Sequence, residues 1–195
     1  YLRTLGAKNI KKIGNLKFSE SSSDLKDRSN FKIKKLLKKK KIVFTAISTH
    51  KGEELLCAKV QANLKKKYKN IISIIIPRHI HRAQEIKNEL NQIGLNVYMH
   101  SSNHHIRDDI DIYLVDTFGE TKSFLKLSKI AFMGKSIHGY GGQNPIEAAR
   151  FGNRIIHGPN IENFVEVYHL LEKHGISTKI KSYKDLEKLI IKFNR

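Results

Sequence analysis

Short apolar runs alternate with segments of helical periodicity along most of this sequence, and that alternation limits the possible folds more than any other feature. The runs at 41–47 (KIVFTAI) and 70–77 (NIISIIIP) are rich in β-branched residues, which is typical of strands buried on both faces. Further strand-like runs lie at 96–100, 111–116, 129–134 and 154–158. Strands that alternate with helices predict a parallel sheet covered on both sides, a doubly wound, Rossmann-like α/β domain.

Apolar residues at helical spacing mark the helices between these strands. The repeats are Leu56, Val60 and Leu64; Ile86, Leu90 and Ile93; Val167, Leu170, Leu171 and His174; and Leu186, Leu189, Ile190 and Phe193. Another helix is expected to begin at Pro145, because proline fits the first turn of a helix. The single cysteine, Cys57, falls inside the first of these helices and is expected to be a packed thiol.

Residues 1–40 differ from the rest of the chain. They hold a serine-rich centre and a run of basic residues, which indicate a connector followed by a short basic helix. Residues 41–195 are expected to form one globular domain, since a chain of 195 residues with 39% hydrophobic content can bury a sizeable core. A single cysteine and the lack of a long apolar run lead us to expect a cytoplasmic chain without a disulfide.

Polar residues follow several of the predicted strands at the point where each strand ends. Ser48, Thr49 and His50 follow the first strand, and Arg78 and His79 follow the second. Because ligands of such folds bind at the carboxyl ends of the strands, we expect these side chains to converge on one crevice. The guanidinium of Arg78 offers a planar fork for a phosphate or a carboxylate.

A glycine-rich loop, GYGGQNPIE, lies after a later strand at 139–147. Gly141 and Gly142 allow the main chain to approach a ligand closely, and the helix that begins near Asn144 would add N–H donors for an anion. Glu147, in the first turn of that helix, can accept hydrogen bonds from a ribose diol. The alternative is a glycine turn before an ordinary helix, with Glu147 serving only the helix dipole.

The histidines of this sequence give little support to a metal site. His79 and His81 alternate without a nearby carboxylate or cysteine, which makes a weak set of ligands. His104 and His105 lie in a polar segment, where exposure to solvent is expected. We therefore predict neither a metal nor another cofactor.

The net charge of +19 comes mostly from lysine runs at 32–41 and 64–69. Few arginines or aromatic residues lie among these lysines, although base readout and base stacking both favour them. Solvated surface is the first interpretation of the lysines, and attraction to an anionic membrane surface is the second, with 38–41 and 65–67 as its densest groups. Nucleic acid is the third, and we predict no nucleic-acid partner.

Six motifs of this sequence resemble, in order and spacing, the donor-binding half of the 3-deoxy-D-manno-octulosonic acid (Kdo) transferases, the lipid A glycosyltransferases of Gram-negative bacteria. They are AISTHKGEE, PRHIHR, DTFGE, MGKSI, GGQNPIEAARFG and GPNIENF. The segment 5–18 is similar to the part of that family that crosses from its first domain to its second. The resemblance implies the C-terminal half of a GT-B glycosyltransferase, which holds the donor CMP-Kdo.

The resemblance also implies roles for the candidate residues. Arg78, His79 and the loop residues Gly141, Gly142, Gln143, Asn144 and Glu147 would hold the CMP part of the donor. Ser48, Thr49 and His50 would face the donor sugar or its phosphate. Gln143 stands where many relatives carry histidine, a change that keeps a hydrogen-bonding group and loses proton transfer.

The implied reaction moves Kdo from CMP-Kdo to a lipid A precursor in lipopolysaccharide biosynthesis, at the cytoplasmic face of the bacterial inner membrane. In the family the general base belongs to the N-terminal domain, and no position of this sequence matches it. We therefore assign no catalytic residue and expect no turnover by this chain alone. The other interpretations are a GT-B-like enzyme of the UDP-sugar epimerase type and a basic nucleic-acid-binding protein.

Overall fold

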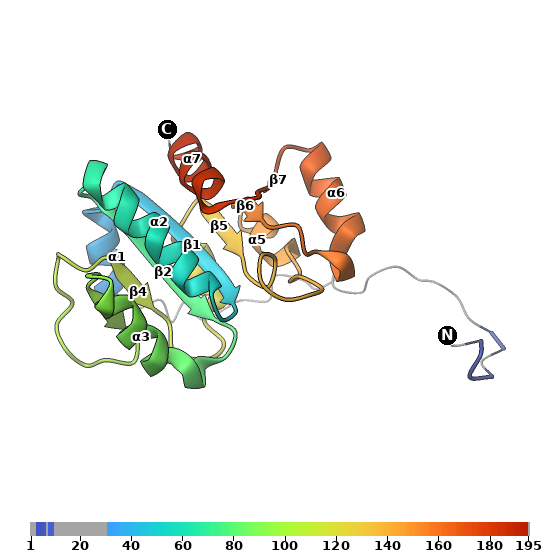
Figure 1. The fold of residues 1–195 in the computed structure, drawn as a ribbon, viewed down its shortest axis with the longest axis horizontal. Coiled ribbons are helices and arrows are strands. Elements are labelled where there is room, and N and C mark those ends of the chain that lie inside the picture. Colours follow the sequence, from blue (N-terminus) through green and yellow to red (C-terminus); the bar gives the residue numbers. More distant parts are fainter. Residues whose placement is uncertain (1–2, 7, 10–30, 195) are drawn as a thin grey trace.

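A seven-stranded parallel sheet forms the centre of the computed structural model, which describes residues 3–6, 8–9 and 31–194 (Figure 1). The strand order is β3-β4-β2-β1-β5-β6-β7. The strands are β1 (Ile42–Thr49), β2 (Ile71–Pro77), β3 (Val97–Met99), β4 (Ile112–Leu114), β5 (Ile130–Met133), β6 (Arg154–His157) and β7 (Ser177–Lys179). Every neighbouring pair is parallel, so the predicted doubly wound sheet is confirmed.

Helices cover both faces of this sheet. One face carries α2 (Glu53–Lys67), α3 (Ala83–Gln92) and α7 (Tyr183–Phe193), whose buried side chains share one apolar cluster with β1 and β5. The other face carries α1 (Phe31–Lys38), α4 (Thr121–Leu125), α5 (Ile146–Arg150) and α6 (Val165–Lys173), around a second cluster. Two short 3-10 turns, η2 (Ile80–Arg82) and η3 (Glu162–Phe164), lead into α3 and α6.

Two details of the helices and strands differ from the sequence-based expectation. The predicted apolar face of α6 is only partly correct. Val167 is buried and Leu171 packs against the second cluster, but Leu170 is 49% exposed and His174 is exposed, whereas Tyr168 is fully buried. The Tyr168 ring packs 4.2 Å from the His157 ring, so contact with β6 decides which side of α6 is buried. The edge strand β7 was not predicted, because Ser177–Lys179 lacks an apolar run and is held by pairing with β6.

The short basic helix expected before the first strand is present as α1. Its Ile33 and Leu36 are buried in the second cluster, so this helix packs onto the domain that follows it. The serine-rich segment and the 10–18 part of the predicted crossing segment lie outside the described residues. The boundary that we place between 1–40 and 41–195 stays a prediction.

The remaining expectations about the core concern Cys57 and membrane spans. Cys57 is fully buried in α2, and burial raises the pKa of its thiol well above the ordinary value, which suits a packed and unreactive side chain. Among the helices that the structure describes, none is both long enough and apolar enough to cross a bilayer.

Candidate functional site

The strand order creates a switch point at the centre of the sheet. From β1 the chain passes to β2 on one side, and it later returns to place β5 on the other side of β1. In open α/β sheets the ligand crevice lies outside the carboxyl ends of the strands at such a point. The loops that follow β2, β1 and β5 carry Arg78, His50 and Gly141, so the fold brings the predicted segments to one edge.

A bulge at Ser48 shapes the end of β1. Ser48 has a φ of 53°, and the register between β1 and β2 shifts there, from Ile47 to Thr49. The bulge directs the Thr49 carbonyl to the backbone N–H of Arg78, which donates to it over 3.0 Å. Ser48 thereby fixes where the Arg78 loop begins.

The end of β5 lies against this bulge, and only glycine fits at the contact. A Cβ on Gly134 would lie 2.6 Å from the Thr49 Cα and closer still to the Ser48 carbonyl oxygen. The N–H of Gly134 donates to the Ile47 carbonyl over 2.8 Å. The absence of a side chain therefore lets the β1 and β5 ends meet, which sets the floor of the site.

Glu53 also follows the first strand in the sequence but is not among the predicted binding residues, and it joins the same two loops. Its side chain is fully buried in the first turn of α2. Its carboxylate oxygens accept five backbone N–H groups over 2.7–3.3 Å, from His50, Lys135, Ser136, Ile137 and His138. Such charge-assisted bonds are stronger than neutral ones. Glu53 therefore occupies the N–H groups at the start of the β5 loop, so these donors are not free to bind another anion.

A second buried carboxylate, that of Glu54, forms a hydrogen bond with Thr49. The Thr49 hydroxyl donates to Glu54 Oε1 over 3.1 Å, and Arg82 Nη1 lies 3.3 Å from the same oxygen. Burial raises the pKa of the Glu54 carboxyl, an effect that the positive charge of Arg82 opposes. Because Thr49 is itself fully buried, its side chain holds the loop in this structure and does not face the crevice.

Histidines gather around the ends of β1 and β2. The His50 and His79 rings meet edge to face at 5.4 Å, and the His81 ring lies 5.7 Å beyond His79. His50 Nε2 is buried and has no hydrogen-bond partner among the described residues. Burial lowers the pKa of His50. The charge of Glu53 opposes this shift, whereas those of His79, Lys135 and Arg78 add to it. The predicted neighbours His50, Arg78 and His79 are thus brought together.

This lowered pKa predicts that the free energy of unfolding falls in mild acid. The unfolded His50 titrates near its ordinary pKa of 6.5 and the folded one below it, so the unfolded chain binds more protons between the two values. We expect the urea midpoint to drop between about pH 7.5 and about pH 5.5, and to drop less in His50→Gln. An equal drop in both proteins would contradict the assignment.

The glycine loop is held by α6 and the turn before it. The N–H of Gly141 donates to Glu162 Oε2 over 2.7 Å, and the Gly141 carbonyl accepts the Asn163 N–H. The Gln143 carbonyl accepts the Tyr168 hydroxyl over 3.0 Å. These contacts define the path of the loop, and they take up the Gly141 N–H that we expected to serve a ligand.

The last two candidates lie where this loop enters α5. Asn144 Oδ1 accepts the N–H of Ile146, the first residue of α5, over 3.1 Å. Glu147 is half-exposed in the first turn, and its carboxylate lies 3.4 Å from Lys122 Nζ on α4. Glu147 thus keeps an accessible carboxylate, although part of its charge is balanced by Lys122.

Arg78 and His79 are the exposed members of the candidate set, whereas Gly141 and Gly142 are buried. Within the described part of the chain, no carboxylate forms an ion pair with Arg78. His104 and His105 are exposed, as expected. The described residues contain no group of three or more histidine, cysteine or acidic side chains placed to hold a metal ion.

Known proteins resemble this chain in sequence. No protein-family model matches it. It is 32% identical over 182 residues to the 3-deoxy-D-manno-octulosonic acid transferase of Rickettsia bellii, a match covering 93% of this chain and 43% of that protein. The transferase of the same name from Haemophilus influenzae is 30% identical over 164 residues, 84% of this chain and 38% of that protein. The chain therefore spans about two fifths of the length of these relatives.

A solved structure resembles it in fold. The C-terminal CMP-Kdo binding domain of WaaA from Acinetobacter baumannii superposes with a TM-score of 0.75 at 23% identity, over 80% of this chain and 81% of that one. This match confirms the expected fold, that of the C-terminal half of a GT-B glycosyltransferase. By sequence, the chain is similar over most of its length to the 3-deoxy-D-manno-octulosonic acid transferases, as its motifs indicated.

Proposed function

We propose that this chain binds CMP-Kdo and serves the transfer of Kdo to a lipid A precursor. The observation that carries the proposal is the exposed guanidinium of Arg78, which forms no ion pair with the described residues and lies beside His50 and His79 at the switch point of the sheet. A planar fork there suits the phosphate of a nucleotide. The names of the relatives support the choice of nucleotide sugar, since they are Kdo transferases.

In this scheme a hydroxyl of the acceptor attacks the anomeric carbon of Kdo, and the bond from that carbon to the phosphate oxygen of CMP breaks. Arg78 neutralises the charge that grows on the departing phosphate, and the half-exposed Glu147 accepts hydrogen bonds from the ribose diol. The proton of the attacking hydroxyl goes to a base outside this chain. The acceptor places the reaction at the cytoplasmic face of the bacterial inner membrane.

Titration of nucleotides against the chain tests the proposal. We expect binding of CMP, weaker binding of UDP, and no change when a chelator is added. Arg78→Ala should weaken CMP binding by about tenfold to a hundredfold, because a charge-assisted hydrogen bond contributes about 1.5–3 kcal/mol. Glu147→Ala should weaken it by a smaller factor.

The exposed Arg107, whose guanidinium contacts Asp109 near the start of β4, gives a matched control. Arg107→Ala should leave the CMP affinity unchanged. Preference for UDP would favour a sugar-nucleotide epimerase. Equal CMP affinity in the original protein and both site variants would rule out this placement of the nucleotide.

A further inference from the structure

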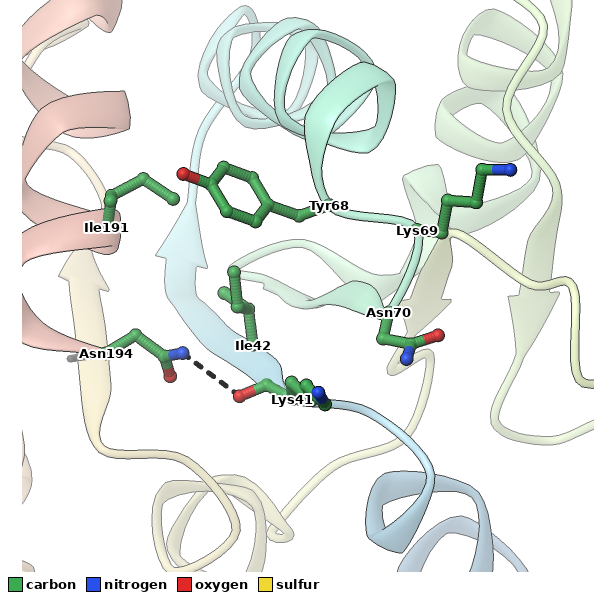
Figure 2. A pocket seen from close by; sticks show the side chains of 7 residues that line it. All are labelled: Lys41, Ile42, Tyr68, Lys69, Asn70, Ile191 and Asn194. Carbon is green, nitrogen blue, oxygen red and sulfur yellow. Dashed lines mark hydrogen bonds between the residues drawn. The ribbon is translucent and has the colours of Figure 1, made fainter.

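A groove lies at the end of the sheet opposite the donor site, between the C-terminal ends of α2 and α7. Two adjoining cavities of about 380 and 440 Å³ share Tyr68 and Ile191, and together we call them the α2–α7 groove. Figure 2 shows the first cavity, where the Tyr68 ring extends toward Ile191 above Ile42. The floor of the groove is therefore apolar, and its tyrosine is half-buried at the rim.

Lysines surround this apolar floor. Lys41, Lys67, Lys69, Lys188 and Lys192 line the two cavities. Among the residues the structure describes, none of these five forms an ion pair with a carboxylate. The one acidic lining residue, Glu187, accepts a hydrogen bond from Asn63 over 2.8 Å. Five lysines against one carboxylate leave the lining of the groove with a net positive charge.

Several other lysines of the chain form ion pairs or hydrogen bonds within the domain. Lys39 pairs with Asp108 and Lys65 with Asp111, while Lys40 donates to the carbonyls of Asp108 and Ile110. These three belong to the densest lysine groups of the sequence, at 38–41 and 65–67. Their contacts leave the rim of the α2–α7 groove as the better-placed positive surface.

We propose that the α2–α7 groove docks this domain onto a membrane surface of anionic phospholipids. Lysine ammonium groups attract lipid phosphates, and the apolar floor can take the glycerol and upper acyl region beneath them. Tyrosine suits this boundary because its ring is apolar and its hydroxyl is polar. Nucleic acid fits less well, since no arginine and a single aromatic ring line the groove among the described residues.

This inference is independent of the proposed function, because it concerns another surface. It orients the domain with the C-terminal ends of α2 and α7 toward the lipid, so the carboxyl edge of the sheet, at the opposite end, faces away from the surface. The donor site then stays accessible from the solution.

The test uses the chain and vesicles of phosphatidylcholine, alone or mixed with phosphatidylglycerol. We expect binding to the mixed vesicles only, and its loss as ionic strength rises from about 0.1 M to about 1 M. Lys188→Gln/Lys192→Gln should weaken partitioning by about 30-fold, which is about 1 kcal/mol for each lysine. The control Lys126→Gln/Lys173→Gln removes two exposed lysines from the opposite helix layer and should have little effect.

Two further measurements distinguish binding through the α2–α7 groove from nonspecific attraction between the lysines and the anionic vesicles. Tyr68→Ser should weaken vesicle binding while CMP affinity and the unfolding midpoint confirm a folded protein. Equal losses in the two lysine double variants, with no effect of Tyr68→Ser, would overturn the proposal. So would displacement from vesicles by free glycerol phosphate, or binding of a duplex oligonucleotide by the same lysines without vesicle binding.

Discussion

Glu53→Ala is expected to lower the free energy of unfolding by about 3 kcal/mol or more, and so to lower the melting temperature by about 6–12 °C. The substitution leaves five backbone N–H groups without the carboxylate that accepts them, at a position that is fully buried. Leaving a buried donor unsatisfied costs about 1–3 kcal/mol, and five donors in one loop relax together instead of adding in full. Thermal and urea unfolding measure the change.

The matched control for this prediction is Glu85→Ala, on the next helix. The Glu85 side chain is 55% exposed and lies 3.6 Å from Arg82, so its loss should cost less than about 0.5 kcal/mol. Glu53→Gln should fall between the two, because it keeps one acceptor oxygen and loses the charge. A Glu53→Ala protein as stable as Glu85→Ala would show that the β5 loop does not depend on the carboxylate.

Gly134→Ala is expected to have an effect of similar size, for a different reason. Its new methyl group would meet the Ser48 and Thr49 backbone, which cannot move aside as a side chain can. The ends of β1 and β5 would have to separate, at a cost of about 3 kcal/mol, the upper end of what overpacking typically costs. Because the Thr49 carbonyl holds the Arg78 N–H, we also expect weaker CMP binding in the protein that remains folded.

Gly175→Ala provides the comparison for this variant. Gly175 has a φ of 66°, but no atom lies within 4 Å of a Cβ built there. Alanine at that position should therefore cost only the left-handed backbone strain, about 1–2 kcal/mol. Equal urea midpoints for the two alanine variants would mean that β1 and β5 do not need their close contact.

Local patterns in the sequence were sufficient for much of the fold. β-branched runs and helical repeats predicted six strands and the principal helices, because both periodicities come from neighbouring residues. The apolar face of α7 was predicted from the same signal, and its Leu186 and Ile190 are buried. The signal was only partly correct for the face of α6 and missed β7, where contact with β6 decides burial and pairing.

For the candidate site too, one part could be predicted from the sequence and another part depended on the tertiary structure. The sequence by itself placed Arg78, His79 and the glycine loop after strands, and parallel strands carry their carboxyl ends to one edge. Only the tertiary structure decided which polar groups remain available there. The Thr49 hydroxyl donates to Glu54, and the Gly141 N–H donates to Glu162. The N–H groups of Lys135 and Ser136 donate to Glu53.

The reason is that the strand order determines which groups of the strand-end loops come close enough to form hydrogen bonds, even when they lie far apart in the sequence. Glu53 and Ser136 lie 83 residues apart, yet they meet because β5 crosses back to pair with β1. From the sequence alone, a glutamate at the start of a helix is expected only to place a favourable charge at the positive end of the helix dipole. Its role as the acceptor that fixes two loops exists only once both strand ends lie at the same edge.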